Sequence, residues 1–418
     1  MTNAQRRSNK FIYLGKKLKL NKIIHLFFFL KNFFYFGGIL WGKLTSIKEI
    51  LVGSFPNIEV LSYENIRLYF CAPVFNDGLN IKPELSEGRE YVEYALLIKD
   101  AIIYGDSNLI ELSQNEILFD LPFYDESSKF GYTNHYSKIV TIKGNNIFYW
   151  KNKTLNMEKA IWIGGNYSWN YYHLLYEYAI KFIKLNKLNI PLDIPVLVDQ
   201  ICLDIPQFKE LLDIANNKGY KMIGIDRKYR VKAGELIYIN CPNLIPPDVK
   251  KDSQISDIQF NIKAICEFRD YLLQYSSQKK FPKRFFISRK NASSRRKFNE
   301  EAIINLLSEF EFETVFPETL SFADQISLFN QAEFIMGGSG AAFTNLLFCN
   351  PNCKVVMFII ARYPTTTFST IARAVNIDLL YITEEDTNKN LITESIHDPF
   401  EIDIRYLKEQ LIRLIENE

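Results

Sequence analysis

Residues 334–348 have the sequence FIMGGSGAAFTNLLF, in which two apolar runs flank a glycine-rich turn. This order predicts a strand from Phe334 to Met336 and a helix from Ala341 to Phe348. Glycines let the backbone approach a ligand closely, and the start of the helix offers unpaired N–H groups. The turn departs from the dinucleotide-binding pattern GxGxxG, and no acidic residue follows it at the expected distance. The sequence therefore disfavours a dehydrogenase.

The same alternation continues on both sides of this stretch and predicts a doubly wound parallel sheet of about 100 residues. The other expected strands are Arg284–Ser288, Glu313–Phe316, Lys354–Phe358 and Leu379–Ile382. The other expected helices are Glu300–Phe310, Phe322–Asn330, Thr366–Val375 and the final Asp403–Glu416.

A second strand-and-helix rhythm, from residue 160 to residue 225, predicts another parallel sheet, and residues 50–150 have β-rich patterns. The expected elements between residues 160 and 225 are strand Ala160–Ile163, helix Tyr171–Leu188, strand Pro195–Val198, helix Phe208–Lys218 and strand Lys221–Ile225. A helical pattern over Asp257–Ser277 ends in a polar break, which we interpret as a domain boundary. We therefore expect an α/β protein with domains at 49–278 and 279–418, preceded by a distinct segment at 1–48.

The chain has 418 residues and a net charge of +2, which is unevenly distributed. Residues 1–48 contain ten Lys or Arg and no acidic residue, so the other 370 hold 40 basic and 48 acidic residues, or −8. This pattern favours a local anionic partner, such as a lipid surface, and gives no sign of general nucleic-acid binding. The six cysteines form no CxxC pair and indicate reduced thiols of a cytosolic protein rather than a metal site.

The segment at 1–48 contains two apolar runs, Ile23–Leu30 and Phe33–Trp41, separated by Lys31 and Asn32. A membrane-spanning helix needs about 20 mainly apolar residues, and a central Lys is costly there. Basic residues before the runs are attracted to anionic lipid, and the aromatic residues suit the membrane interface. We favour a helix that lies on the inner face of the membrane, while a buried helix and a true span stay open.

Residues 279–297 contain nine basic residues and no acidic one. A solvated loop is the plain interpretation of such a run. Here the run is interrupted by the expected strand at 284–288, so Arg289 and the loop that contains Arg295 follow the carboxyl end of a strand, where open α/β sheets bind ligands. Arg suits bidentate phosphate contact, so Arg289 and Arg295 are candidates for binding a diphosphate.

His173 is the most distinctive of four histidines, since it ends the block Asn-Tyr-Ser-Trp-Asn-Tyr-Tyr-His at 166–173. Glu177 follows four residues later on the same helical face and could orient the imidazole. A histidine near a helix start that follows a Gly-Gly loop could act as a general base toward a hydroxyl. The alternative is a structural histidine within an aromatic interface.

Several ordered motifs, which together span about residues 160–360, resemble glycosyltransferase family 61. That family includes bacterial capsular-polysaccharide proteins and eukaryotic xylosyl- and N-acetylglucosaminyltransferases. The motifs are Asn170–His173, Phe286–Arg289, Arg295, Asn299-Glu300, Pro317-Glu318, Leu320–Phe322, Gln325 and Gly337–Phe348.

The resemblance implies a GT-B fold of two Rossmann-like domains, with a nucleotide-sugar donor bound in the C-terminal one and a saccharide or lipid-linked acceptor in the N-terminal one. It implies an inverting mechanism in which basic side chains and a helix start stabilise the leaving diphosphate, without a cofactor or metal. On this basis Gly338, Ser339, Gly340, Ala341 and Asn345 join the donor-binding candidates, and Glu318 joins His173 and Glu177 as a catalytic candidate. The expected role is transfer to a bacterial surface polysaccharide, in the cytoplasm at the inner membrane face.

One position departs from the resemblance, because eukaryotic members often have His within the turn where this chain has Ser339. Serine is not a base at neutral pH without help, so Ser339 is expected to contact phosphate. The departure leaves open a catalytically silent carbohydrate-binding or scaffold subunit of polysaccharide assembly. A teichoic-acid-like phosphotransferase is a further alternative.

Overall fold

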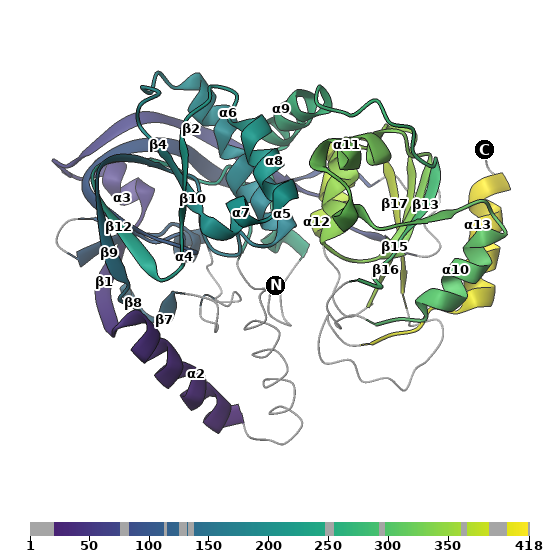
Figure 1. The fold of residues 1–418 in the computed structure, drawn as a ribbon, viewed down its shortest axis with the longest axis horizontal. Coiled ribbons are helices and arrows are strands. Elements are labelled where there is room, and N and C mark those ends of the chain that lie inside the picture. The colour runs from purple at the N-terminus through teal and green to yellow at the C-terminus, as the bar shows by residue number, and fades with distance from the viewer. Residues whose placement is uncertain are drawn as a thin grey trace.

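The computed structural model describes residues 21–75, 83–112, 115–124, 132, 138–246, 255–291, 297–360, 366–383 and 399–416. These residues form a mixed α/β fold with two β-sheets, as expected from the sequence. We call the part built on the first sheet the N-terminal lobe (purple to teal in Figure 1) and residues 284–416 the C-terminal lobe (green to yellow).

The sheet of the C-terminal lobe is parallel throughout and has the order β14-β13-β15-β16-β17-β3. Its strands are β13 (Arg284–Ile287), β14 (Glu313–Val315), β15 (Phe334–Gly338), β16 (Lys354–Ile359), β17 (Asp378–Thr383) and, from far upstream, β3 (Val74–Phe75). The helices are α10 (Glu300–Ser308), η4 (Pro317–Thr319), α11 (Phe322–Asn330), η5 (Ala341–Phe348), α12 (Thr366–Ala374) and α13 (Ile404–Glu416). If β13 to β17 are numbered 1 to 5 along the chain, they lie in the sheet in the order 2-1-3-4-5. The direction of winding therefore reverses between β13 and β15. Ligands of open α/β sheets bind at such a switch point, beyond the carboxyl ends of the strands.

The sheet of the N-terminal lobe has a parallel part with the order β11-β10-β9-β12. These strands are β9 (Lys153–Trp162), β10 (Val196–Asp199), β11 (Met222–Ile225) and β12 (Tyr229–Ile239). Their order along the chain, 3-2-1-4, is again that of a Rossmann-like unit, with its switch point between β9 and β12. The helices between them are α5 (Tyr171–His173), η2 (Leu174–Ala179), α6 (Lys181–Lys187), α7 (Gln200–Asp204) and α8 (Pro206–Ala215).

Beyond β12 the same sheet continues with mostly antiparallel strands, as the β-rich patterns predicted. These are β1 (Ile39–Thr45), β2 (Ile58–Phe70), β4 (Ser86–Tyr104), β5 (Ile110–Glu111), β6 (Glu116–Leu118), β7 (Ile139–Lys143) and β8 (Asn146–Trp150). Short helices α3 (Ile47–Val52), α4 (Leu121–Tyr124) and η3 (Ile255–Asp257) flank them, and α9 (Ile262–Leu273) leads to the C-terminal lobe.

Two helices differ in type from the sequence-based expectation. The helix expected at 341–348 is a 3₁₀-helix, η5, rather than an α-helix. The helix expected at 171–188 contains a π-helical turn, η2, between α5 and α6. π-Helical turns inside helices occur frequently at functional sites, and this one directly follows His173.

The N-terminal segment is divided between a helix and a strand. Helix α2 (Asn21–Phe36) ends where Gly37 and Gly38 adopt φ of +77° and +119°, a backbone region that favours glycine. The apolar run expected at 33–41 therefore does not form one helix, because its last residues belong to β1, which pairs with β6 and β8. Across the described residues, no helix is long and apolar enough to cross a membrane.

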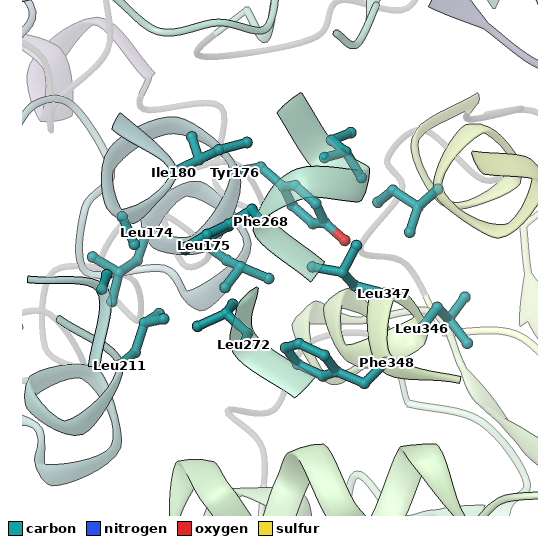
Figure 2. Close-up of a cluster of buried hydrophobic side chains, with 14 of the residues drawn as sticks. Leu174, Leu175, Tyr176, Ile180, Leu211, Phe268, Leu272, Leu346, Leu347 and Phe348 are labelled. Carbon is teal, nitrogen blue, oxygen red and sulfur yellow. The ribbon is translucent and has the colours of Figure 1, made fainter. Parts of the chain in front are cut away.

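A continuous apolar core joins the two lobes. Figure 2 shows leucine and aromatic side chains of η2, α8 and α9 facing those of η5. The labelled residues of this core are Leu174, Leu175, Tyr176, Ile180, Leu211, Phe268, Leu272, Leu346, Leu347 and Phe348. Dry packing of this kind stabilises one relative arrangement of the lobes, since separating them would expose this apolar surface.

Polar contacts cross the same boundary. Arg269 of α9 donates from Nε to the carbonyl of Leu347 at 2.8 Å and from Nη2 to that of Cys349 at 3.0 Å. The carboxylate of Glu210, on α8, accepts from the N–H of Phe322 at 2.6 Å. Glu210 therefore caps the start of α11, where the helix has unpaired N–H groups and a positive dipole end.

Candidate functional site

Arg289 and the glycine-rich turn meet at the switch point of the C-terminal sheet. Arg289 lies two residues beyond β13, and its Nη1 donates to the carbonyl of Ser339 at 3.1 Å. The guanidinium packs so closely that a Cβ placed on Gly340 would lie 2.0 Å from Nη1, and a Cβ on Gly338 would lie 3.2 Å from its Cδ. A side chain at Gly340 would therefore displace the arginine, whereas at Gly338 it would first meet the ring of Phe298, 2.6 Å from the added Cβ.

The backbone of Arg289 is held by Glu300, at the start of α10. The Glu300 carboxylate accepts from the Arg289 N–H at 3.1 Å and also from the hydroxyl of Ser288. Burial lowers the pKa of the Arg289 guanidinium, while Glu300 and then Glu318 oppose that shift. The Nε of Arg289 is buried and has no hydrogen-bond partner within the described residues. Such a partly buried, partly unpaired guanidinium is suited to binding an anion.

The start of η5 supplies backbone donors beside this arginine. The N–H of Ser339 is bonded to the carbonyl of Phe358 at 2.9 Å, and that of Phe343 to the carbonyl of Gly340 at 3.1 Å. The N–H groups of Gly340 and Ala341 are then the candidate donors to a ligand. A helix start of this kind favours phosphate through its N–H groups and its dipole.

His173 and Glu177 interact at the carboxyl edge of the N-terminal sheet. Nδ1 of His173 is hydrogen-bonded to Oε1 of Glu177, as their spacing predicted. The side chains are 13% and 6% exposed, so both are shielded while the imidazole retains some access to solvent. The ring of Tyr167 stacks on His173 with centroids 5.3 Å apart, and Tyr167 has a φ of +65°, which is uncommon outside glycine. With Nδ1 bound to a carboxylate, Nε2 is the nitrogen that could accept a proton.

The two edges are tied together by residues of the expected motifs. The hydroxyl of Tyr171 donates to Oδ1 of Asn345 at 2.6 Å, and Nδ2 of Asn345 donates to Oε1 of Gln325 at 2.9 Å. The hydroxyl of Tyr176 donates to the carbonyl of Thr344 at 3.1 Å. The start of α5, which ends at His173, is thereby fixed against η5, which begins beside Arg289.

Asp199 is a site residue that the sequence reasoning missed. It is the last residue of β10, and its carboxylate accepts from the N–H of Gly165 at 2.9 Å and of Asp106 at 2.5 Å. Burial, and then the Asp106 carboxylate, raise the pKa of Asp199 to about 7. Asp199 thus holds the Gly164-Gly165 loop that leads to His173. The signal was visible in the sequence as an acidic residue directly after a buried strand.

The remaining predicted residues fall in three different situations. Glu318 is exposed in η4, beyond the carboxyl end of β14. It therefore lies at the same edge of the C-terminal sheet as Arg289, and it opposes the lowering of the pKa of that arginine. Asn345 is fully buried, and both polar atoms of its side chain are already hydrogen-bonded, so its role toward a ligand stays a prediction. Arg295 lies outside the described residues.

The described part of the chain contains no group of three or more His, Cys, Asp or Glu side chains that could hold a metal ion. Cys349 and Cys353, the closest pair in sequence, are buried free thiols beside η5 and β16.

The family model for glycosyltransferase 61 matches residues 171–356. The matched segment begins at Tyr171 and contains His173, Glu177, Arg289, Glu318 and the glycine-rich turn. The match supports glycosyltransferase activity for this part of the chain, with a sugar donor and an acceptor as its substrates. No curated protein matches the chain.

Proposed function

We propose that the protein is an inverting glycosyltransferase of the GT-B type, which transfers a sugar from a nucleotide donor to a bacterial surface polysaccharide. The observation that carries this proposal is the contact of Arg289 with the glycine-rich turn at the switch point of the C-terminal sheet. The family match supports the glycosyltransferase part of this proposal independently of that geometry.

The donor diphosphate would bind between the Arg289 guanidinium and the N–H groups that begin η5. One further negative charge develops on the diphosphate as the bond to the sugar breaks, and preorganised donors aimed at developing charge are a major source of catalysis. An arginine and a helix start can stabilise this leaving group without a metal ion. Ser339 would contribute its backbone position, since its carbonyl orients Arg289.

His173 would be the general base that deprotonates the acceptor hydroxyl. Glu177 holds Nδ1, which leaves Nε2 free to take the proton of the acceptor. The acceptor oxygen would then attack the anomeric carbon as the bond to the diphosphate breaks, inverting that centre. Tyr171 and Asn345 would keep this base in register with the donor, because they link α5 to η5.

The exposed surface of α2 supports a location of the protein at the inner face of the membrane. Leu26, Leu30, Phe33 and Phe34 are exposed there, and Trp41 of β1 is exposed nearby. The chain around them is basic without an acidic residue up to position 48. Apolar and aromatic groups beside basic ones suit an anionic bilayer surface, which we propose as the partner of this helix.

A panel of nucleotide sugars tests the proposal through thermal unfolding followed by detection of released nucleoside diphosphate. A ligand at 100 times its Kd that binds only the folded state stabilises it by about 2.7 kcal/mol, which is readily measured. We expect one nucleotide family to stabilise the protein and its sugar form to be turned over with an acceptor. Stabilisation without release of nucleoside diphosphate would instead favour a silent binding subunit, and a phosphodiester product a phosphotransferase.

A further inference from the structure

The imidazole of His173 is in contact with a carboxylate and two aromatic rings. Nδ1 is hydrogen-bonded to Glu177, the ring of Tyr167 stacks on the imidazole at an interplanar angle of 27°, and the ring of Tyr172 meets it edge-on at a centroid distance of 5.1 Å. The carboxylate fixes one nitrogen, whereas a stacked ring restricts the plane in which the imidazole lies. The direction of Nε2, the nitrogen that could accept a proton, therefore depends on Tyr167 as well as on Glu177.

Tyr167 adopts a backbone conformation that is unfavourable for its own side chain. Its φ of +65° lies in the left-handed region, where a bulky residue is an outlier. Glycine and asparagine adopt this region more readily, but neither has an aromatic ring to place against His173. Strained residues cluster at functional sites, where the surrounding structure holds them in place. The strain at Tyr167 therefore points to a functional role for its ring.

The backbone that leads to Tyr167 is anchored at two consecutive residues. The carboxylate of Asp199 accepts from the N–H of Gly165 at 2.9 Å, and Oδ1 of Asn108 accepts from the N–H of Asn166 at 3.1 Å. Because each of these N–H groups is bound by a side chain, the loop has little freedom to move the ring that follows it.

Asp106 anchors Tyr167 itself. Burial raises the pKa of Asp106, and the charges of Arg227 and Lys138 oppose that shift. A hydrogen bond from the N–H of Tyr167 also opposes it, so the aspartate carboxylate and the tyrosine backbone stabilise each other. Asp106 and Asn108 lie between β4 and β5, which precede the segment that the family model matches. The support of the imidazole thus comes from a part of the chain outside that segment.

We propose that Tyr167 is a positioning residue for His173, and that Asp106 and Asn108 hold it in that place. The role of His173 as base rests on the proposed function, while the placement of its imidazole by Tyr167 does not. The stacked ring keeps the imidazole from rotating, so the proton on Nδ1 stays with Glu177 and Nε2 stays directed at the acceptor hydroxyl. Tyr167 exchanges no proton with the substrate, and its ring matters rather than its hydroxyl.

Nuclear magnetic resonance of the full-length protein with isotope-labelled histidines tests this placement. The chain has four histidines, so His173→Ala identifies the signal. We expect the Nδ1 proton of His173 to give a sharp signal in wild type and in Tyr167→Phe, which keeps the ring. Tyr167→Asn removes the ring but suits the left-handed backbone, so the imidazole can rotate and this proton should exchange with water about tenfold faster. Unchanged exchange in Tyr167→Asn, or fast exchange already in Tyr167→Phe, would overturn the proposal.

Steady-state kinetics measure the consequence for the reaction. Tyr167→Asn should lower kcat about 10- to 100-fold, as small misplacements of reacting groups do, and leave the Kd for the nucleoside diphosphate unchanged. Tyr167→Phe should match wild type, and so should the control Tyr63→Asn, which makes the same change at an exposed ring of β2. Equal kcat in Tyr167→Asn and Tyr167→Phe, or a matching loss of nucleotide affinity in Tyr167→Asn, would contradict a positioning role.

Two further results separate this proposal from its premises. The exchange of the Nδ1 proton is read without turnover, so it decides the placement even if His173→Ala remains active, a result that would count against the proposed base alone. Asn108→Ala keeps the ring but releases the N–H of Asn166, so it should speed the same exchange by a smaller factor than Tyr167→Asn. Unaltered exchange in Asn108→Ala would remove this anchor from the proposal.

Discussion

The C-terminal sheet and the parallel part of the N-terminal sheet have the same architecture at their carboxyl edges, but the side chains there differ in chemistry. At the edge of the C-terminal sheet, Arg289 follows β13 and packs against Gly340 in the turn that follows β15. At the edge of the N-terminal sheet, β9 and β10 lead to a glycine loop, His173 and the buried carboxylates of Glu177 and Asp199. One edge presents positive charge and N–H donors, and the other presents proton acceptors.

The comparison shows that strand order places a site and that only the residues at the strand ends decide what it can do. Both sheets have a switch point, and both place a glycine loop beside it. An anion such as a diphosphate suits the first edge, and a hydroxyl that must lose a proton suits the second. The hydrogen bond between Tyr171 and Asn345 links the two edges, which the proposed reaction requires to act together.

The largest effect is expected from removing the base at the N-terminal edge. His173→Ala should lower kcat by roughly 10²–10⁴, the usual contribution of general base catalysis, and change donor affinity little. Glu177→Gln should cost less, because it orients the imidazole without taking the proton. A pH–rate profile of the wild type beside His173→Ala and Glu318→Ala measures this. Near-normal turnover in His173→Ala with activity lost in Glu318→Ala would assign the base to the other edge.

The next effect is at the C-terminal edge and concerns binding. Arg289→Ala should raise the Kd for the nucleoside diphosphate about 10- to 150-fold, since a charge-assisted contact contributes about 1.5–3 kcal/mol. Lys290→Ala is the matched control, because that side chain is exposed and belongs to the same basic run. Calorimetry separates the two variants. An unchanged Kd in a folded Arg289→Ala protein would remove this arginine from the site.

A smaller effect should follow when the arginine is displaced rather than removed. In Gly340→Ala the new Cβ would lie 2.0 Å from Nη1 of Arg289, so the guanidinium must shift. Overpacking of this kind costs about 1–3 kcal/mol, and we expect donor affinity to fall about tenfold while kcat with saturating donor is retained. Steady-state kinetics with varied donor resolve the two parameters. A variant that binds donor normally would show that the close packing has no role in recognition.

The buried carboxylate at the other edge predicts a pH dependence of stability. The pKa of Asp199 is raised to about 7, so the folded state binds its proton more tightly than the unfolded state. Its contribution to stability is greatest below pH 4, declines as pH rises from about 4 to 7, and is lost above about 7. Urea unfolding at pH 5 and pH 8 should therefore show a fall of at least about 1 kcal/mol in wild type that is smaller in Asp199→Asn. Equal falls in the two proteins would contradict this assignment.

The smallest effect is expected outside both edges, on the exposed side of α2 that we propose binds the membrane. Phe33→Ser with Phe34→Ser should reduce binding to vesicles with phosphatidylserine several-fold, because two exposed aromatic side chains no longer enter the interface. Deleting residues 1–48 is a poorer test, since it removes β1 from the sheet. Val52→Ser, an exposed apolar residue on α3, is the control. Vesicle sedimentation that does not distinguish the double variant from wild type would refute the contact.

The local patterns of the C-terminal lobe were sufficient to predict five of the six strands of its sheet, but not β3, which comes from far upstream. Each strand there is a short apolar run that a glycine or polar turn separates from a helix, so the period of the pattern changes clearly at every boundary. Arg289 could be placed at a strand end for the same reason. Its contact with Gly340 could not, because that contact depends on the pairing of β13 with β15, which are far apart in the sequence.

The N-terminal lobe was harder to predict because its strands are defined by distant partners. Strand β12 alternates charged and apolar residues around Gly234 and becomes a central strand only through β4 and β9. Strand β1 was hidden within an apolar run that suggested a membrane helix, although Gly37 and Gly38 marked its start. Asp199 was visible as an acidic residue after an apolar run, but its role depends on where the Gly165 loop folds back, which that run does not indicate.

The most direct test of the central claim is a crystal structure of the protein with the nucleoside diphosphate that the thermal panel selects. We predict that the diphosphate lies between the guanidinium of Arg289 and the N–H groups of Gly340 and Ala341, with the leaving oxygen directed toward the N-terminal edge and His173. A diphosphate bound elsewhere, or an Arg289 guanidinium that does not touch it, would contradict the account.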